Sequence, residues 1–281
     1  MAVTSDVTAL IDLTGKTAVV TGGGKGMGVG ICRALVQAGA TVCVADIDEP
    51  AAQSTVDALT KNGGSAYAVH VDMSQPASVA ALAAAVTERS GSLDIWVNNA
   101  GVYPMIPVFS DSTDLWDFTH NVNLRGVFVG IREAARQMIA AKRPGVIVNI
   151  ASIAADRAGH VSMTPYAASK AGVKALTRSM AAALGPFGIR VAAVSPGVIE
   201  TDGMAAQEQE MATAGANTGN RASLIPLRRI GTPDDIGRAV LFMASDLASF
   251  VTGVTLDVDG GDATGGKANP DVPLSVLGLE G

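Results

Sequence analysis

The sequence predicts an α/β fold in which a doubly wound, seven-stranded parallel sheet is covered by helices on both faces of a single domain. Short β-branched runs alternate with longer alanine-rich segments of helical period, which is typical of repeated β–α–β units. Hydrophobic residues make up 48% of the chain and charged residues 16%, which is enough apolar surface to bury both faces of a sheet. The length of 281 residues fits one large domain of this class better than two average domains.

The strands and helices are expected in alternation along the whole chain. The strand candidates are residues 17–21, 41–46, 66–71, 94–97, 146–150, 189–194 and 254–258. The helical stretches lie near residues 26–38, 51–61, 77–90, 113–141, 165–184 and 233–244. Because β–α–β crossovers are right-handed, ligands are expected at the carboxyl ends of the strands.

Two segments break the alternation. Residues 200–228 have no strong period and are long enough to form a lid over a substrate, since structureless insertions of that length in compact domains are usually functional. Residues 262–281 form a tail that contains Gly and Pro after the last strand. The folded domain is therefore expected to span residues 1–261.

The charge and the cysteine content exclude several classes of function. The net charge is -6 and no Lys/Arg cluster is present, so a nucleic acid would be repelled. No apolar run approaches the ~20 residues of a membrane-spanning helix, and the N-terminal residues lack the basic and apolar regions of a secretion signal. Cys32 and Cys43 fall in different elements, with no metal-ligand spacing around them. The sequence therefore predicts a cytosolic protein without a metal site.

A glycine-rich turn follows the first strand. It reads TGGGKGMG over residues 21–28 and leads into an apolar helix. Glycines let the chain turn sharply and bring backbone N–H groups close to a pyrophosphate, which then lies at the positive end of the helix. Gly22, Gly26 and Gly28 keep a three-glycine pattern whose first gap is three residues instead of the single residue of the common fingerprint.

This turn resembles the T-G-x-x-x-G-x-G motif of the short-chain dehydrogenase/reductase family, and the resemblance covers nearly the whole chain from about Leu13 to Gly261. It implies a Rossmann fold and a nicotinamide cofactor. The residues that the resemblance assigns to cofactor binding are Gly22, Lys25, Gly26, Met27, Gly28, Asp46, Ile47, Asp72, Met73, Asn99, Ala100, Gly101, Tyr166, Lys170, Pro196, Gly197, Val198 and Thr201. Asn98, which opens the N-N-A-G segment, fits a role in cofactor binding or in support of the sheet.

The end of the second strand favours NAD(H) over NADP(H). Asp46 lies about 20 residues past the glycine turn, where a carboxylate accepts hydrogen bonds from the adenosine ribose hydroxyls. A 2′-phosphate there would meet a like charge, and Asp48 and Glu49 add to that repulsion. Lys25 argues the other way, because a basic residue in this loop can approach a 2′-phosphate in some relatives.

Four residues match the catalytic pattern of the family in order: Asn123, Ser152, Tyr166 and Lys170. Tyr166 and Lys170 are four residues apart, so a helix places their side chains on one face. The resemblance implies that Tyr166 exchanges the proton, Ser152 holds the substrate oxygen and Lys170 lowers the pKa of the tyrosine. It also implies that Asn123 interrupts its helix and holds a water against Lys170.

The expected substrate is a medium-sized or bulky lipophilic secondary alcohol or ketone, aromatic or alicyclic, because the candidate lining is mainly apolar and rich in methionine. The residues expected to contact it are Tyr103, Met105, Ile153, His160 and Met204. Arg157 and Arg221 would contribute if they turned inward.

The helices at residues 113–141 and 165–184 carry apolar residues beyond a single stripe, which indicates a buried partner face. The resemblance implies a homotetramer formed through them. Two alternatives remain at this stage. An NADPH-dependent 3-oxoacyl carrier-protein reductase shares every catalytic motif, although Asp46 disfavours it. A non-catalytic NAD-sensing protein would be expected to lack the Tyr or the Lys.

Overall fold

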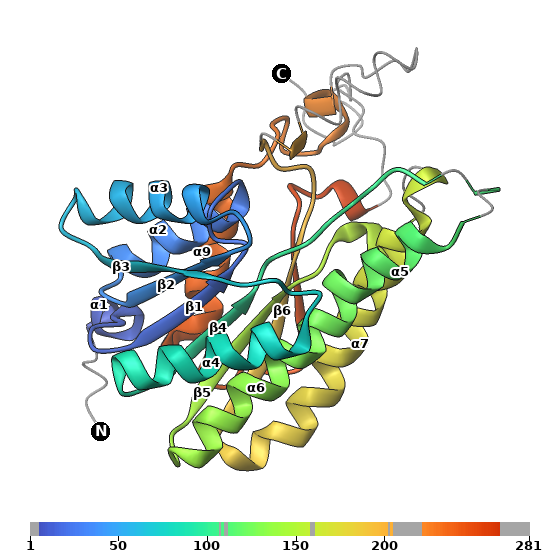
Figure 1. The fold of residues 1–281 in the computed structure, drawn as a ribbon. Coiled ribbons are helices and arrows are strands. Elements are labelled where there is room, and N and C mark those ends of the chain that lie inside the picture. Colours follow the sequence, from blue (N-terminus) through green and yellow to red (C-terminus); the bar gives the residue numbers. More distant parts are fainter. Residues whose placement is uncertain are drawn as a thin grey trace, which may run out of the picture.

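Seven parallel strands form one sheet in the order β3-β2-β1-β4-β5-β6-β7, which confirms the predicted fold class (Figure 1). The computed structural model describes residues 6–106, 108–109, 112–157, 161–201, 203–204 and 221–264. The strands are β1 (Thr17–Thr21), β2 (Thr41–Asp46), β3 (Ser65–His70), β4 (Ile95–Asn98), β5 (Gly145–Ile150), β6 (Ile189–Pro196) and β7 (Thr255–Val258). Their bounds differ from the predicted ones by at most two residues.

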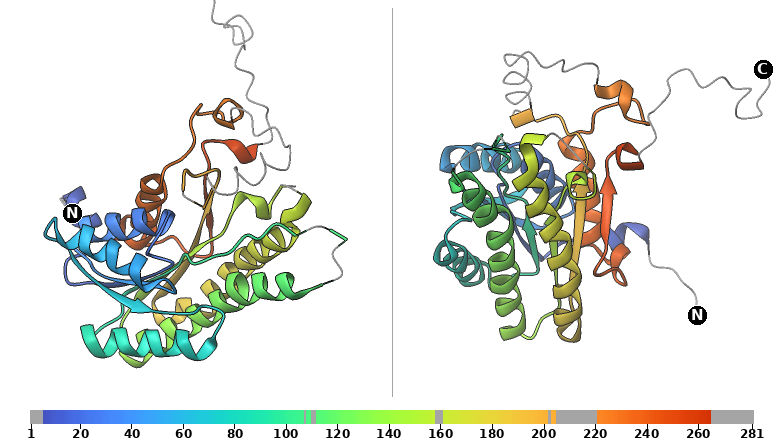
Figure 2. Two further views of the ribbon diagram at one scale, coloured as in Figure 1. Left: turned by 45° about the horizontal axis from the view of Figure 1, so that its top comes forward. Right: turned by 90° about the vertical axis from the view of Figure 1, so that its right-hand side faces the viewer.

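Helices cover the sheet on both faces, and each face has its own apolar core (Figures 1 and 2). One core contains residues of α2 (Met27–Gln37), α3 (Glu49–Thr60) and α9 (Pro233–Ala244). The other contains residues of α4 (Pro76–Ser90), α6 (Val127–Ala140) and α7 (Thr164–Leu184). Burial of apolar side chains on both faces explains why the central strands read as continuous apolar runs.

The order of the strands reverses between β1 and β4. The chain passes outward through β2 and β3, returns to pair β4 with the other side of β1, and then continues to β7. Connections that leave the carboxyl ends of β1 and β4 in opposite directions open a crevice between them, where doubly wound folds bind their ligands. The glycine turn and the Asn99–Gly101 segment both start at this crevice.

The helix predicted over residues 113–141 is interrupted. It consists of α5 (Asp114–His120), a π-helical turn (Asn121–Gly126) and α6. The π turn contains Asn123, as the expected disruption at this amide suggests, and such turns are frequent at functional sites. The structure also contains a short helix that was not predicted, α1 (Val7–Ile11), whose five residues are too few to establish a helical period.

A chain of polar side chains crosses the core between β4, β5 and α7. Trp96 Nε1 donates to Asn98 Oδ1 (2.7 Å), and Asn98 Nδ2 donates to Asn149 Oδ1 (2.8 Å). Asn149 Nδ2 then donates to Thr177 Oγ1 (3.0 Å), whose hydroxyl donates to Val173 O (2.8 Å). Asn98 therefore supports the sheet, which decides between the two roles that its motif allowed.

Part of the predicted lid, residues 202 and 205–220, and most of the predicted tail, residues 265–281, lie outside the described residues. The described parts of these segments form short 3₁₀ helices at Arg221–Leu224 and Asp262–Thr264. Among the helices that the structure describes, none combines the length and the apolarity that crossing a membrane requires.

Candidate active site

The glycine turn places the amino end of α2 against the crevice. Gly22 has a positive φ of 63°, and a Cβ at this position would lie 2.8 Å from Ala100 Cα. A side chain is therefore excluded both by the backbone conformation and by the close approach. Gly26 is the N-cap of α2 and has no side chain to cap it, so the helix offers N–H groups to an anion.

Asn99 connects the glycine turn to the end of β4. Its Nδ2 donates to Thr21 O (3.0 Å) and Gly22 O (2.9 Å), while its backbone N–H donates to Thr21 Oγ1 (3.1 Å). Its Oδ1 is buried and has no hydrogen-bond partner among the described residues. A buried acceptor without a donor is costly. Its position on the wall of the crevice fits a donor group of a bound dinucleotide.

Asp46 is held in place by the backbone. Its Oδ2 accepts from Gly24 N (2.9 Å), its Oδ1 accepts from Asp48 N (3.0 Å), and the residue is 9% exposed. A carboxylate has about four acceptor sites, so two remain for the hydroxyls of a ribose. Lys25 and Asp48 form an ion pair (2.5 Å), which corrects the expectation that Asp48 adds repulsion: its charge is balanced by Lys25.

A cavity of about 540 Å³ runs along the crevice and collects most of the residues predicted to bind the cofactor. Its lining includes Gly22, Lys25, Gly26, Met27, Asp46, Ile47, Asp72, Met73, Asn99, Ala100, Gly101 and Thr201. Phe118 and Val122, which were not predicted, also line it. Phe118 and Val122 are four residues apart on the continuous helix formed by α5 and the π-helical turn. This spacing predicts that they share one face of the helix, and it was the only sequence signal for their place in the cavity.

A second cavity of about 390 Å³ adjoins the first, since Met27, Tyr103 and Thr201 line both. It contains the two predicted catalytic hydroxyl groups, on Ser152 and Tyr166. Pro196, Gly197 and Val198, which were assigned to the cofactor, also line this second cavity. The two cavities together provide a dinucleotide groove that opens beside a smaller chamber.

The hydroxyl-bearing residues Ser152 and Tyr166 both line the smaller chamber. Ser152 follows β5, is 8% exposed, and its Oγ accepts from Ala154 N (3.1 Å). Loss of solvation on burial raises the pKa of Tyr166, and the hydrogen bond with Ser152 opposes that rise. The ring of Tyr166 packs edge to face with that of Tyr103, with 6.2 Å between the centroids.

Lys170 lies behind Tyr166 on α7, and its Nζ is 5.7 Å from the centre of the tyrosine ring. The ammonium donates to Ile150 O (2.8 Å), and burial lowers the pKa of Lys170 to about 8. Lys170 was expected to lower the pKa of Tyr166, yet the pKa of the phenol is raised. Desolvation is the largest cause of that rise and Lys170 is not among the causes, so the effect expected of Lys170 stays a prediction.

Asn123 is fully buried, and its amide is bonded to the loop after β4. Its Oδ1 accepts from Val102 N (2.8 Å), and its Nδ2 donates to Val102 O (2.7 Å) and Ser169 Oγ (3.3 Å). Both amide protons are therefore in use, whereas Oδ1 keeps one acceptor site, and the expectation that Asn123 orders a water stays a prediction. The Asn123 side chain is still close to Lys170: a Cβ built at Gly101 would lie 3.4 Å from Asn123 Oδ1 and 3.5 Å from Lys170 Nζ.

The predicted substrate residues divide into three groups. Tyr103, Ile153 and Met204 line the smaller cavity, and so do Arg157 and Arg221, which were expected only if they turned inward. Met105 does not line it, and the next residue, Ile106, donates its backbone N–H to Ser162 O (2.8 Å). His160 lies outside the described residues.

A Lys170→Met protein should melt at a higher temperature than the wild type at neutral pH, by a few degrees, while losing activity. The ammonium is 3% exposed, and burial lowers its pKa from 10.5 to about 8. Between these two pH values the unfolded chain binds more protons, so the wild type gains stability as the pH rises. The advantage of the variant should be complete below pH 8 and vanish near pH 10.5. Scanning calorimetry across this range tests it, and a lower melting temperature of the variant at neutral pH contradicts it.

Known proteins are similar to this chain in sequence and in fold. The family model described as Enoyl-(Acyl carrier protein) reductase matches residues 22–262. The chain is 41% identical over 252 residues to 3beta-hydroxysteroid dehydrogenase 1 of Eggerthella lenta, covering 89% of this chain and 94% of that protein. It is 37% identical over 251 residues to a 3-oxoacyl-[acyl-carrier-protein] reductase of Chlamydia pneumoniae, covering 89% and 98%. The crystal structure of a candidate 2-deoxy-d-gluconate 3-dehydrogenase from Agrobacterium tumefaciens with bound NADP matches with a TM-score of 0.81 at 34% identity, covering 91% and 99%.

Proposed function

Since the chain belongs to the short-chain dehydrogenase/reductase family, we propose that it is an NAD-dependent oxidoreductase that interconverts a secondary alcohol and a ketone. The observation that carries the proposal is the pair of hydroxyl groups of Ser152 and Tyr166 in a chamber that opens onto the dinucleotide groove. A hydroxyl pair placed there can bind one oxygen atom while the adjoining carbon faces the groove.

The residues of the chamber act on the proton and on the substrate oxygen. Tyr166 removes the proton from the alcohol, and Ser152 donates a hydrogen bond to the oxygen as its charge changes. The bound dinucleotide supplies the hydride acceptor. Asn123 is a positioning residue, because its amide holds Val102 on the wall of the groove.

Asp46 supports the choice of NAD over NADP. Its carboxylate is fixed by two backbone N–H groups and points a negative charge at the groove. The charge of Lys25 is balanced by Asp48, which leaves Asp46 as the main carboxylate that a 2′-phosphate would meet.

The chamber favours a lipophilic substrate. Most of its lining is apolar, with Met27, Met163 and Met204 among the contacts, and methionine adapts to irregular shapes. The similarity to a 3beta-hydroxysteroid dehydrogenase supports an alicyclic alcohol of this kind. Aromatic and alicyclic secondary alcohols are therefore the first substrates to test.

A panel of secondary alcohols and ketones, assayed with NAD(H) and with NADP(H), tests the proposal through the absorbance of the reduced nicotinamide. Turnover of alicyclic or aromatic alcohols with a preference for NAD supports it. A lack of turnover by the intact protein on every substrate contradicts it and favours a non-catalytic NAD-sensing role.

A second candidate is an NADPH-dependent reductase of 3-oxoacyl carrier-protein thioesters. The similarity to the Chlamydia pneumoniae protein and the description of the matching family model favour it. The negative charge of Asp46 disfavours NADPH. Reduction of an acetoacetyl thioester with NADPH, faster than any oxidation of an alcohol with NAD, would establish this candidate in place of the first.

An Asp46→Ala protein should lose its preference for NAD. We expect the ratio of kcat/KM for NAD to that for NADP to fall at least ~10-fold, because the ribose loses an acceptor and the phosphate loses a repelling charge. Both cofactors use the same glycine turn, so the ratio cancels general damage to the loop. Asp57→Ala, on the outer face of α3, is the matched control and should leave the ratio unchanged. An unchanged ratio in Asp46→Ala would argue against ribose recognition by this carboxylate.

We also propose a homotetramer of 28.3 kDa chains in the cytosol. Leu115, Trp116, Phe128 and Ile139 expose apolar surface on the rod formed by α5 and α6. Large apolar side chains exposed along two consecutive helices are typical of a surface that contacts another subunit. Light scattering should give the mass of four chains, and Phe128→Glu should give a smaller particle; a monomeric wild type contradicts the proposal.

The buried free thiols of Cys32 and Cys43 suit a reducing compartment.

A further inference from the structure

The segment that follows β5, residues 152–157, forms one wall of the smaller chamber and is called the wall loop here. It contributes Ser152, Ile153, Ala154 and Arg157 to the lining. A short 3₁₀ helix at Ile153–Ala155 occupies its middle, and its last two residues are exposed. The shape of the chamber depends on what holds the outer end of this loop.

Arg157 is bonded to a single residue far along the chain. Its Nη1 donates to Asp262 Oδ1 (2.8 Å) and to Asp262 O (3.1 Å), and its Nη2 donates to Asp262 Oδ2 (2.6 Å). The arginine side chain is 42% exposed, but that of Asp262 is only 12% exposed. A two-pronged contact of this kind fixes the direction of the guanidinium as well as its position.

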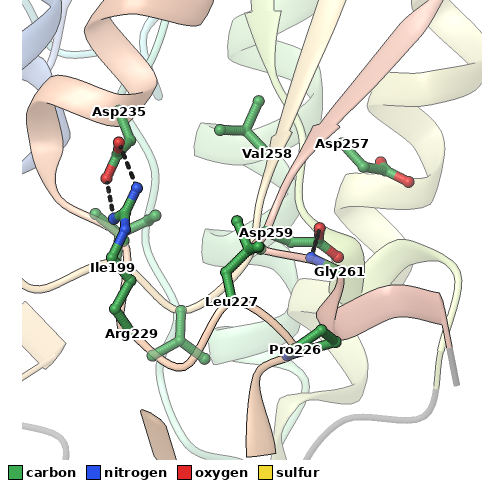
Figure 3. A pocket seen from close by; sticks show the side chains of 12 residues that line it. Ile199, Pro226, Leu227, Arg229, Asp235, Asp257, Val258, Asp259 and Gly261 are labelled. Atoms are coloured by element: carbon green, nitrogen blue, oxygen red, sulfur yellow. Dashed lines mark hydrogen bonds and ion pairs between the residues drawn. The ribbon is translucent and has the colours of Figure 1, made fainter. Parts of the chain in front are cut away.

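The turn after β7 presents Asp262 in one orientation. Asp259 accepts from Gly261 N (2.8 Å) and from Ala263 N (2.6 Å), so its carboxylate spans the residues on both sides of Asp262. Figure 3 shows Asp259 turned toward Gly261 beside the end of β7. Leu227 N donates to Gly260 O (3.1 Å), which attaches the turn to the last residues of the predicted lid. Asp262 therefore projects from a turn that is itself fixed.

The preceding residue, Asp156, forms a second ion pair, in which the loop contributes the negative charge instead of the positive one. It bonds to Lys174 on α7, and Lys174 Nζ lies 3.7 Å from Asp257 on β7. The lysine side chain is only 10% exposed, so solvent screens this pair less than most surface pairs. A shift of the loop by one residue in one direction would bring Arg157 to Lys174, and a shift in the other direction would bring Asp156 to Asp262. The like charges that would then meet keep the loop in its register.

We propose that Arg157 and Asp262 determine substrate specificity as positioning residues, because their ion pair, with Asp156 and Lys174 beside it, fixes the wall loop against the segment that follows β7. The inference rests on the proposed alcohol dehydrogenase activity. A bulky substrate that reaches the wall loop depends on the pair for its orientation. A small alcohol that touches only Ser152 and Tyr166 does not.

The kinetic test compares Arg157→Gln, Asp262→Asn, the double variant and the charge-reversed R157D/D262R protein. Each single variant should raise KM for a bulky alicyclic alcohol roughly 10-fold with little change in kcat, and the double variant should do no worse than either single one. Charge reversal should recover most of the loss. In Asp262→Asn, whose residue does not line the chamber, KM and kcat for 2-propanol and the affinity for NADH should stay within about twofold of the wild type.

Arg33→Gln is the matched control. Arg33 pairs with Asp234 (2.6 Å) between α2 and α9, and the two side chains are 45% and 46% exposed. Its loss should leave KM for both alcohols unchanged. Equal effects of Arg157→Gln on the bulky and the small alcohol, or additive effects in the double variant, overturn the proposal.

Hydrogen exchange gives a readout that does not need turnover. Arg157→Gln should speed amide exchange in residues 259–264 as well as in the wall loop, and Asp262→Asn should do the same, because each segment holds the other. Unchanged exchange in residues 259–264 of Arg157→Gln overturns the coupling. If the wild type oxidises no alcohol, the proposed function fails, while the exchange result still decides whether the two segments are joined.

Discussion

A Tyr166→Phe protein should oxidise secondary alcohols at least ~10³-fold more slowly than the wild type, because a positioned acid or base contributes about 10²–10⁴-fold to such reactions. The substitution removes one oxygen atom and keeps the ring, which packs against Tyr103 with 6.2 Å between centroids. The hydroxyl group faces the smaller chamber, so the affinity for NADH should stay the same. Steady-state rates and fluorescence titration with NADH measure the two quantities.

Tyr67→Phe is the matched control for this variant. Tyr67 lies on β3, and its hydroxyl group bonds to Ser90 Oγ (3.2 Å) on α4, away from both cavities. The control should retain wild-type rates. A Tyr166→Phe protein with near-normal activity would remove Tyr166 from the reaction.

The rate of the wild type should depend on pH in opposite senses for the two directions. Oxidation requires the phenolate of Tyr166, whereas reduction requires the phenol. Burial raises the pKa of Tyr166, so the rate of oxidation should increase with pH through the neutral and alkaline range, and reduction should be favoured at lower pH. Initial rates across a buffer series at saturating cofactor measure this; a rate of oxidation that falls as the pH rises contradicts it.

A Gly28→Ala protein should lose most of its affinity for NADH, by roughly 100-fold, and should melt several degrees lower. The Cβ of alanine would lie 2.0 Å from Gly22 O and 2.8 Å from Gly23 Cα. Both atoms belong to the backbone of the glycine turn, so no side chain can rotate away and the turn itself must move. Helix propensity alone would predict the opposite result, since alanine stabilises a helix by about 1 kcal/mol relative to glycine.

Gly185→Ala separates this steric conflict from a general effect of the substitution. Gly185 follows α7 with a helical φ of −53°, and a Cβ there would meet nothing within 4 Å. The control should bind NADH normally and melt no lower than the wild type. An unchanged NADH affinity in Gly28→Ala would show that the turn tolerates displacement.

Most of the fold could be predicted because its signals are local. All seven strands occur where β-branched runs occur, and the alternation with helices determines a parallel sheet. The π-helical turn at Asn121–Gly126 was suggested only by an amide in a helical pattern. The helix α1 was not predicted because five residues are too few to establish a helical period.

Site residues could be predicted where their place on the backbone brings them to the cavity. They were harder to predict where contacts between distant side chains bring them there. The glycine turn and the strand ends contribute to the cavity walls as expected, because parallel strands present their carboxyl ends together. Met105 was misplaced, and its neighbour Ile106 has a hydrogen bond to Ser162 that joins segments far apart in the sequence. Nothing in the sequence pointed to the ion pair of Asp262 with Arg157. Lys174 lies one helical turn after Lys170, and this spacing could have indicated that Lys174 also lies near the site.

The polar chain through Trp96, Asn98, Asn149 and Thr177 has a consequence for how the protein can evolve. Asn98 and Asn149 each donate and accept, so the loss of either would leave a buried group of its neighbour without a partner. Thr177 lies on the helix that carries Tyr166 and Lys170, and Asn149 lies on the strand that leads to Ser152. Substitutions at these positions are therefore expected to occur together in homologous proteins. The relative position of α7 and β5 would be conserved in the same proteins.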